Sequence, residues 1–293
     1  MKWPLSAFAD EAGGQIDEQI KALHREGIDR IDLRGVNGHN ITVLPLDLAE
    51  EIRAKLDAAG VTVQMYGSPI GKIDIADDVQ SDLDRLTHLG KLKPILGCGA
   101  VRFFSYYNKT ELPENQWRDK CLENMARLME VAERYDLVLY HENERHIFGD
   151  LVRNVCVLRD ECHAKNPGRF KMIFDFDNYN QSGEDVWAAW QELGPTTEAI
   201  HFKDSKRLAD GSYQHVPAGT GDGHIPRILQ TLADRGWNGP LTLEPHLTHS
   251  AMVLTTGSSG EGDKALKDLP PAETFHIAAE HALAILKDVG RWA

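Results

Sequence analysis

The chain has 293 residues, of which 42% are hydrophobic and 26% are charged, and its formal net charge at pH 7 is -13. This composition is typical of a globular protein with a substantial core, and it excludes a chain that is disordered along most of its length. The acidity argues against nucleic acid and anionic membrane surfaces as partners, because both repel a negatively charged protein.

The amino-terminal segment contains neither a long apolar stretch nor a small-residue cleavage site, so it does not resemble a signal peptide. No other segment approaches about 18 uninterrupted apolar residues, the length that a membrane-spanning helix needs. We therefore expect a cytoplasmic protein with no membrane partner.

Short apolar runs alternate with segments of helical pattern along the chain, and most of the runs turn polar at their ends. The runs are residues 5–11, 29–35, 62–68, 100–106, 137–143, 171–178, 198–204 and 240–246. Between them, apolar residues recur at helical spacing, as at Ile16, Ile20 and Leu23. This alternation predicts an α/β fold, and we expect one (β/α)₈ TIM barrel domain over residues 1–293. An open, doubly wound sheet is the alternative that the same pattern allows.

Three connections are longer than a barrel requires, namely residues 106–117, 205–224 and 247–272. Loops of this length commonly form lids or binding surfaces. The Gly/Ser-rich tract at residues 255–262 predicts either a mobile lid or a disordered surface excursion. Trp and Tyr residues near these loops favour a homo-oligomer.

Each of the last four runs carries a carboxylate or an imidazole near its polar end, namely Glu142, Asp175, His201 and Glu244. In a (β/α)₈ barrel the carboxyl ends of the strands meet at one face, where the chemistry collects. Taken alone, each side chain could cap a helix or lie in the core, but together they predict a site for one divalent metal ion. The oxygen and nitrogen ligands favour Mn²⁺, with Mg²⁺, Co²⁺ and Zn²⁺ as alternatives.

The two glutamates of this set suit proton transfer at a sugar that binds the metal through a carbonyl and a neighbouring hydroxyl. Glu142 and Glu244 enter on either side of the other two ligands, so one can remove a proton beside the carbonyl while the other returns one. Lys203 points inward on the strand of His201 and is a candidate for stabilising an enediolate oxygen. His246, two residues beyond Glu244, is either a catalytic acid or base or a supporting residue.

Five motifs stand at these strand ends: HENE at 141–144, FDFDN with QSG in 174–183, HFKD at 201–204, VPAGTGDG at 216–223 and LEPH at 243–246. In these motifs the chain resembles the xylose isomerase-like barrel superfamily of sugar isomerases and epimerases, over nearly its whole length. The resemblance implies one divalent ion held by the four residues above, with the two glutamates as acid and base. It also implies an isomerase or epimerase acting on a sugar or keto-sugar through an enediolate.

Two positions depart from the ketose 3-epimerases of that superfamily. Asn178 stands where some of them place a substrate-binding His, and Gln214 and His215 stand where they carry a substrate-orienting Arg. The motifs are closer to a branch that includes inosose dehydratase and enzymes that eliminate from 3-keto-glycosides. The alternative function is therefore a metal-dependent lyase or dehydratase, in which β-elimination from a 3-keto-glycoside, keto-sugar or inosose follows the same deprotonation. His246 or Lys203 would supply the extra acid or base, and Asn178 and His215 are candidate substrate contacts.

Four further residues follow the first four strands and are candidates for substrate contact: Glu11, Arg34, Ser68 and Tyr106. A salt bridge across the barrel is the alternative role of Arg34, and covering the rim is that of Tyr106. The GTGDG segment at 219–223 suggests phosphate binding, but without the Lys-Ser/Thr of a P-loop a tight glycine turn is favoured. The acidity disfavours a DNA-cleaving relative of the barrel, and a non-catalytic sugar-binding barrel is the remaining alternative.

Overall fold

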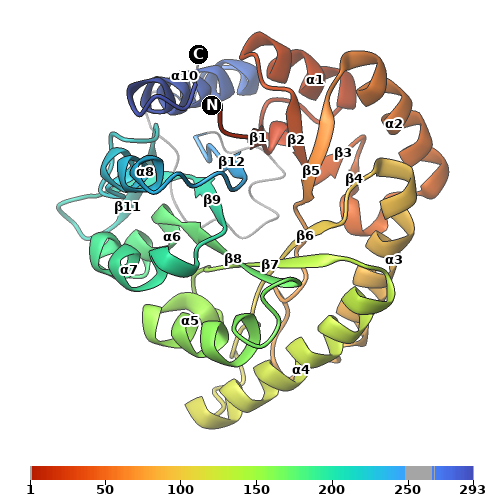
Figure 1. Ribbon diagram of the computed structural model, residues 1–293, viewed down its shortest axis with the longest axis vertical. Coiled ribbons are helices and arrows are strands. Elements are labelled where there is room, and N and C mark those ends of the chain that lie inside the picture. Colours follow the sequence, from red (N-terminus) through yellow and green to blue (C-terminus); the bar gives the residue numbers. More distant parts are fainter. Residues whose placement is uncertain (1, 248–265, 267, 293) are drawn as a thin grey trace.

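The structure is a computed structural model in which residues 2–247, 266 and 268–292 are described. Eight parallel strands form the barrel that the sequence predicts (Figure 1). Their order is β1-β12-β9-β8-β7-β6-β5-β2, and β1 also contacts β2, which nearly closes the sheet. The strands are β1 (Leu5–Ala7), β2 (Arg30–Leu33), β5 (Thr62–Tyr66), β6 (Ala100–Phe103), β7 (Val138–Glu142), β8 (Phe170–Asp175), β9 (Ala199–Phe202) and β12 (Leu241–Leu243). They lie within the predicted runs, except that Phe170 adds one residue to β8.

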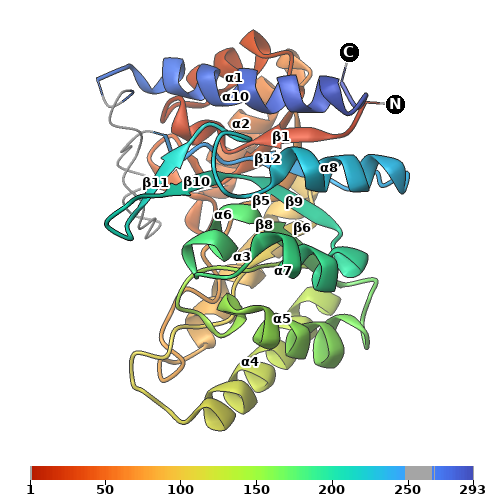
Figure 2. The same ribbon diagram turned by 90° about the vertical axis from the view of Figure 1, so that its left-hand side faces the viewer.

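Helices surround the barrel and cover the outer faces of its strands (Figures 1 and 2). They are α1 (Ile16–Arg25), α2 (Leu46–Ala59), α3 (Gln80–Leu96), α4 (Glu114–Arg134), α5 (Val152–Leu158), α6 (Phe176–Gln181), α7 (Val186–Leu193), α8 (Ile225–Asp234) and α10 (Pro271–Asp288). The apolar stripe expected on α1 faces the core, because Ile16 and Leu23 are buried and Ile20 packs against them while half-buried. Burial of such a stripe stabilises a helix that would be marginal alone in water.

The strands turn apolar side chains outward, toward the helices, and several polar side chains inward. On β2, Ile31 and Leu33 lie in the apolar core. Asp32, between them, accepts hydrogen bonds from the hydroxyls of Ser6 on β1 (2.7 Å) and Thr242 on β12 (2.8 Å). A barrel interior that only served packing would be filled mainly by branched apolar side chains. The polar interior therefore indicates that a site is built along the barrel axis.

Strand register aligns several of these inward residues on one level of the barrel. Ser6 pairs with Thr242, and Thr242 pairs with His201. His201 in turn pairs with Asp175 on β8. Paired residues of parallel strands point to the same face of the sheet, so His201 and Asp175 enter the barrel side by side. Glu244 comes two residues after Thr242 and lies nearer the barrel mouth.

Two β-hairpins extend from the barrel, one formed by β3 (Gly35–Val36) and β4 (His39–Asn40), the other by β10 (Asp204–Arg207) and β11 (Tyr213–Val216). The second hairpin occupies the connection after the seventh barrel strand, where the sequence predicted a long loop. It lies at the side of the barrel opposite the two chain ends (Figure 2). The Gly/Ser-rich tract at 255–262 lies outside the described residues, so its role as a lid stays a prediction.

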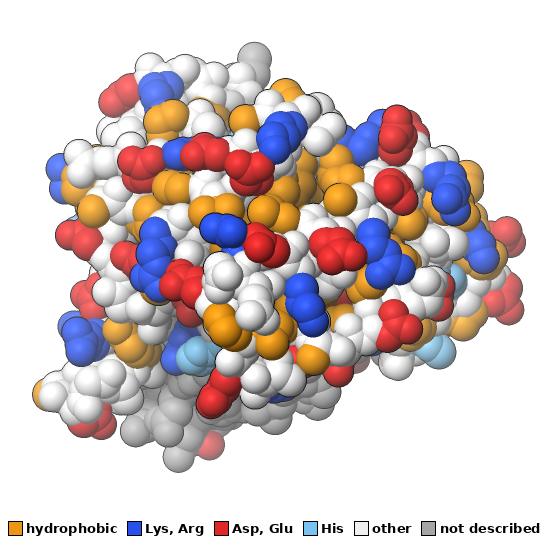
Figure 3. Space-filling model, turned by 90° about the horizontal axis from the view of Figure 1, so that it is seen from below, with side chains coloured by type: hydrophobic (Ala, Val, Ile, Leu, Met, Phe, Trp, Pro, Cys, Tyr) orange, Lys and Arg blue, Asp and Glu red, His pale blue; other side chains and the backbone are white. Residues whose placement is uncertain are grey.

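On the face seen in Figure 3, Lys and Arg side chains are interspersed with Asp and Glu, and apolar side chains lie between them. The described residues of this face therefore form no continuous basic surface of the kind that follows a nucleic acid backbone. None of the described helices is long and apolar enough to span a bilayer.

Candidate metal centre and active site

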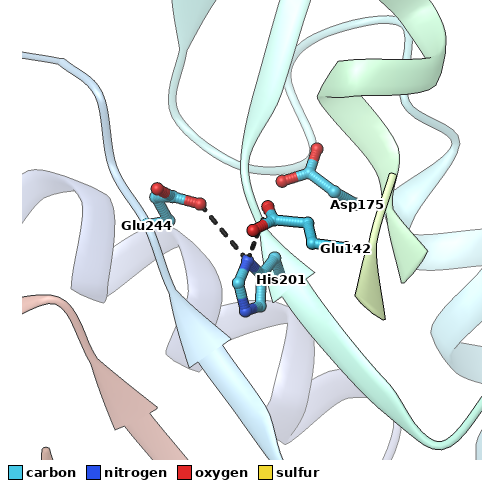
Figure 4. Close-up of side chains that lie close together, drawn as sticks. All are labelled: Glu142, Asp175, His201 and Glu244. Carbon is cyan, nitrogen blue, oxygen red and sulfur yellow. Dashed lines mark hydrogen bonds and ion pairs between the residues drawn. The ribbon is translucent and has the colours of Figure 1, made fainter. Parts of the chain in front are cut away.

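The four side chains that the sequence marks as metal ligands meet at the mouth of the barrel (Figure 4). Glu142 is the last residue of β7, and Asp175 is the last residue of β8. His201 lies one residue before the end of β9, and Glu244 follows β12 directly. One ligand atom from each of the four lies within 4.8 Å of the others, and all four residues are buried. They converge because parallel barrel strands end at the same face.

The closest contacts within this cluster join His201 to the two glutamates. The His201 Nδ1 atom lies 2.9 Å from Glu142 Oε1 and 3.3 Å from Glu244 Oε2 (Figure 4). Asp175 Oδ2 and Glu244 Oε2 are buried and accept no well-aligned hydrogen bond from a described residue, although Lys203 Nζ lies 3.1 Å from the first and 3.6 Å from the second. Buried oxygen atoms without hydrogen bonds are costly unless a cation binds them. Three carboxylates and one imidazole therefore fit a divalent ion that takes oxygen and nitrogen ligands.

The basic side chains of Lys203 and Arg102 lie against these carboxylates, as does that of Arg34. Lys203 Nζ is 3.1 Å from Asp175 Oδ2 and 3.6 Å from Glu244 Oε2. Arg102, on β6, places Nη1 3.1 Å from Glu142 Oε2 and 3.5 Å from Glu244 Oε1. Both cations offset the repulsion among the buried carboxylates. Arg102 was not among the predicted site residues, although a charge inside the apolar run 100–106 could have identified it.

These charges shift the pKa values of the cluster in opposite directions. Burial alone would raise the pKa of Glu142, but His201 and Arg102 lower it to about 2. Burial likewise opposes the charged form of His201, yet Glu142 raises its pKa to about 10. Burial raises the pKa of Asp175 well above its ordinary value. The imidazole of His201 thus carries a proton that a metal ion would displace, so metal binding should depend on pH.

A small cavity at the barrel mouth, with a volume of about 10 Å³, is lined by Glu244 and by several polar side chains. Four predicted site residues are among them, namely Asn178, Lys203, His215 and His246. Asn178 Nδ2 donates to the Asn143 carbonyl at 2.8 Å, which orients its amide beside the cluster. His246 Nε2 lies 3.1 Å from Glu244 Oε1, and burial lowers the pKa of His246 to about 4. The structure therefore brings these predicted residues together with the metal ligands.

Arg34 forms the salt bridges across the barrel that were its alternative role. Its guanidinium donates to Asp10 at 2.8 and 2.9 Å, to Glu11 at 3.1 Å and to Glu244 at 3.2 Å. Burial would lower the pKa of Arg34, but Asp10 and Glu11 raise it. Glu11 also accepts the backbone N–H of His246 at 2.7 Å, and burial raises the pKa of Glu11 to about 8. Both residues thus support Glu244 and His246 from outside the cavity lining.

Ser68 and Tyr106 do not line the cavity. The Ser68 hydroxyl donates to the Arg102 carbonyl at 2.5 Å, so it ties the end of β5 to β6. Tyr106 is fully buried, and burial together with Asp82 of α3 and Cys121 of α4 raises its pKa well above the ordinary value. Its ring therefore lies between the barrel and the helices, and this placement does not support the predicted substrate contact of either residue.

Asp204 organises the glycine-rich segment 219–223. Its carboxylate accepts backbone N–H hydrogen bonds from Gly219 at 2.9 Å, from Gly221 at 3.0 Å and from Gly223 at 3.0 Å. A Cβ atom at Gly221 would lie 2.5 Å from Asp204 Oδ1, which excludes a larger residue there. The amides that could bind a phosphate are thus engaged by Asp204, in agreement with the glycine-turn interpretation.

The sequence model of the family described as "Xylose isomerase-like TIM barrel" matches residues 20–267. The L-ribulose-5-phosphate 3-epimerase UlaE of Escherichia coli is 23% identical over 176 residues, which cover 60% of this chain and 60% of that protein. A solved structure described as IOLI protein with a bound zinc atom has a TM-score of 0.72 at 12% identity, with 99% of each chain covered. The probable 3-DHS dehydratase AsbF from Bacillus anthracis has a TM-score of 0.70 at 16% identity, with 96% of this chain and 98% of that one covered. At these identities the similarity to the solved structures shows the fold.

Proposed function

Since this chain belongs to the xylose isomerase-like TIM barrel family, we propose that it is a divalent-metal-dependent sugar isomerase or epimerase. The observation that carries the proposal is the buried convergence of Glu142, Asp175, His201 and Glu244 at the barrel mouth. The substrate would be a small sugar or keto-sugar, and the reaction would begin with removal of a proton from the carbon beside its carbonyl. The name of the Escherichia coli relative, an L-ribulose-5-phosphate 3-epimerase, is consistent with this chemistry.

The four ligand side chains would hold one ion, for which we propose Mn²⁺, with Mg²⁺, Co²⁺ or Zn²⁺ as alternatives. When bound, the ion would polarise the substrate carbonyl and acidify the neighbouring C–H bond. The zinc atom described for a similar structure keeps zinc among the candidates.

Glu142 and Glu244 are the proposed base and acid. They reach the cluster from β7 and from the end of β12, on either side of β8 and β9 in the barrel order. A substrate between them would present one face to each carboxylate, so removing a proton from one face and returning it to the other would invert a centre. Arg102 lies 3.1 Å from Glu142 and 3.5 Å from Glu244, where it holds both carboxylates in place.

Lys203 is the proposed stabiliser of the enediolate oxygen. Burial would lower its pKa, but Asp175 and Glu244 raise it well above the ordinary value, so the ammonium group stays charged. A fixed cation beside an oxygen that becomes negative stabilises the transition state more than the bound substrate, because the charge develops only in the transition state. This difference accelerates the reaction.

A lyase or dehydratase is the second candidate function, because the cavity carries more proton-transfer groups than an epimerase needs. His215 and His246 line it in addition to Glu244. Epimerisation requires one acid and one base, whereas elimination also benefits from an acid that protonates the departing oxygen. The similarity to a protein named as a probable 3-DHS dehydratase is consistent with this candidate.

Proton NMR of the metal-loaded protein in D₂O, with a panel of ketohexoses, 3-keto-glucosides and inososes, tests the proposal. Deuterium at the carbon beside the carbonyl would establish the deprotonation. The accompanying product, an epimer or isomer on one hand and an unsaturated ketone on the other, would distinguish the two candidates. Glu142→Gln and Glu244→Gln should each slow the exchange by about 100-fold or more, the usual contribution of a general acid or base.

Glu123→Gln, at an exposed position of α4, is the matched control and should exchange at the wild-type rate. Metal content is measured for each variant, because loss of the ion and loss of a proton-transfer group would otherwise have the same effect. Wild-type exchange in either site variant would refute the role of that glutamate. No exchange with any compound, despite one bound equivalent of metal, would refute the proposed substrate class.

A further inference from the structure

We propose that His215, held by Asp177, is a general acid that protonates an oxygen leaving group. The substrate would then be a keto-sugar that carries such a group at the carbon β to its carbonyl. This inference rests on the proposed deprotonation at the metal centre, and it assigns the step that follows in the second candidate function, the lyase or dehydratase.

Asp177 and His215 form a buried pair at the barrel mouth. His215 Nδ1 lies 3.1 Å from Asp177 Oδ2, and the two side chains are 2% and 0% exposed, respectively. Both residues line the same cavity as Glu244. A carboxylate beside Nδ1 orients an imidazole, as in acid–base catalysts of unrelated fold. The pair therefore has the composition and geometry of a proton donor with its orienting group.

One further side chain of the cavity wall binds the Asp177 carboxylate, and a second binds the first. Gln181 Nε2 donates to Asp177 Oδ2 at 2.7 Å, and Arg145 Nη1 donates to Gln181 Oε1 at 2.8 Å. All three residues line the cavity, so this hydrogen-bonded series runs along its wall and ends at Asp177, whose carboxylate forms the ion pair with His215. A carboxylate that is fixed in this way fixes the imidazole that it contacts.

The backbone that carries His215 is tied to the helix that carries Asp177. In the β10–β11 hairpin His215 stands opposite Ser205. Asn180, on α6, donates to both the carbonyl and the hydroxyl of Ser205 at 3.0 Å. Asp204, next to Ser205, holds the glycine-rich segment that follows the hairpin. The relative position of donor and orienting group is therefore set by the fold, and it does not depend on the pair alone.

One imidazole ring separates His215 from the metal ligands. His246 Nε2 lies 3.1 Å from Glu244 Oε1, and the rings of His246 and His215 meet edge to face, with centroids 5.3 Å apart. Glu244, His246 and His215 line the same cavity, so a sugar that binds beside Glu244 would also meet His246 and His215. His215 is thus placed to act on an oxygen farther along the sugar, and Glu142 and Glu244 are placed to act beside the carbonyl.

The step needs no oxidant or reductant. A glutamate takes the proton beside the carbonyl, and the electrons of that C–H bond enter the enolate. These electrons then form the C=C bond to the β carbon as its C–O bond breaks, and the electrons of the C–O bond leave on the oxygen. The ring N–H proton of His215 passes to that oxygen. The products are an unsaturated ketone and an alcohol or water, and the glutamate and the imidazole then exchange protons with solvent.

His215→Gln separates the two steps. In D₂O the metal-loaded variant should exchange the hydrogen beside the carbonyl at a rate within about threefold of wild type. From a 3-keto-glucoside with an alkyl leaving group, it should form product about 100-fold more slowly than wild type, or slower still. With a 4-nitrophenyl leaving group, which departs without a proton, the loss should fall below about tenfold. Asp177→Asn, which leaves the imidazole in place, should show the same pattern and serves if His215→Gln does not fold. His24→Gln, an exposed histidine of α1, is the control and should match wild type.

Four results would overturn the inference: an epimer as the only wild-type product, wild-type product formation by His215→Gln, an equal loss of exchange and product, or a loss independent of the leaving group. Failure of the proposed function looks different, because metal-loaded wild type would then show no exchange with any of the substrates.

Discussion

Asp32 provides a prediction in which stability and metal binding change in opposite directions. Its buried carboxylate accepts hydrogen bonds from two hydroxyls, those of Ser6 at 2.7 Å and Thr242 at 2.8 Å. Thr242 pairs in register with His201, so Asp32 lies in the level of the barrel that contains this metal-ligand candidate. Burial raises the pKa of Asp32 from 3.8 to about 6, although Ser6 opposes the shift.

The change we propose is Asp32→Asn, which removes the charge and keeps the shape. Because the folded pKa is raised, the folded state holds the proton more tightly than the unfolded chain does. The contribution of Asp32 to stability is therefore complete below about pH 4 and is lost as the pH rises through 6. A shift of about 2 units corresponds to about 3 kcal/mol. The metal-free variant should accordingly be more stable than wild type by up to about 3 kcal/mol at pH 8 and by little at pH 4.

The same substitution should weaken metal binding, because it removes a negative charge near His201. Carboxylates hydrogen-bonded to a metal-binding histidine typically contribute about 10- to 100-fold in affinity. Asp32 is hydrogen-bonded to Ser6 and Thr242 and acts on His201 through its charge, so we expect a loss near the lower end of that range, about tenfold. Urea denaturation of the metal-free proteins at pH 4 and pH 8 measures the first effect, and titration calorimetry with Mn²⁺ measures the second. A stability difference that is the same at both pH values, or an unchanged metal affinity, would refute this reasoning.

Three further perturbations have defined expectations. Metal at about 1,000 times its Kd should add about 4 kcal/mol to the unfolding free energy. EDTA should therefore lower the Tm of metal-loaded wild type and leave the Tm of Asp175→Asn unchanged. Equal responses of the two proteins would contradict the proposed metal site. Arg34→Met should cost roughly 3 to 5 kcal/mol in urea denaturation, because it leaves buried carboxylates without their cation, and a cost below about 1 kcal/mol would contradict that account. Gly71→Ala should cost roughly 2 to 4 kcal/mol in the same assay, since φ is +84° and an added Cβ would lie 2.1 Å from the Phe104 carbonyl oxygen; a neutral result would show that the turn can move.

Much of the candidate site was predictable because of where its residues fall along the strands. Glu142, Asp175 and His201 interrupt apolar runs at the same point of successive units, and a barrel brings such points to one face. Arg102 carried a comparable signal, as a charge within an apolar run, but periodicity alone does not show that it contacts two glutamates. For Tyr106 the position along the strand was misleading. It follows its strand, yet its side chain turns toward the helices, where burial, Asp82 and Cys121 raise its pKa.

The sequence by itself determined the alternation of strands and helices, because apolar spacing records which side of each element must be buried. It also determined the position of the metal-ligand candidates, since those follow from the strand ends. Only the tertiary structure decided which charges meet: Arg34 joins Asp10 and Glu11 instead of lining the cavity, and His215 meets Asp177 across two elements. The physical reason is that the local spacing of apolar residues predicts which residues are buried. The partner of a buried charge, in contrast, depends on distances between segments that are remote in sequence.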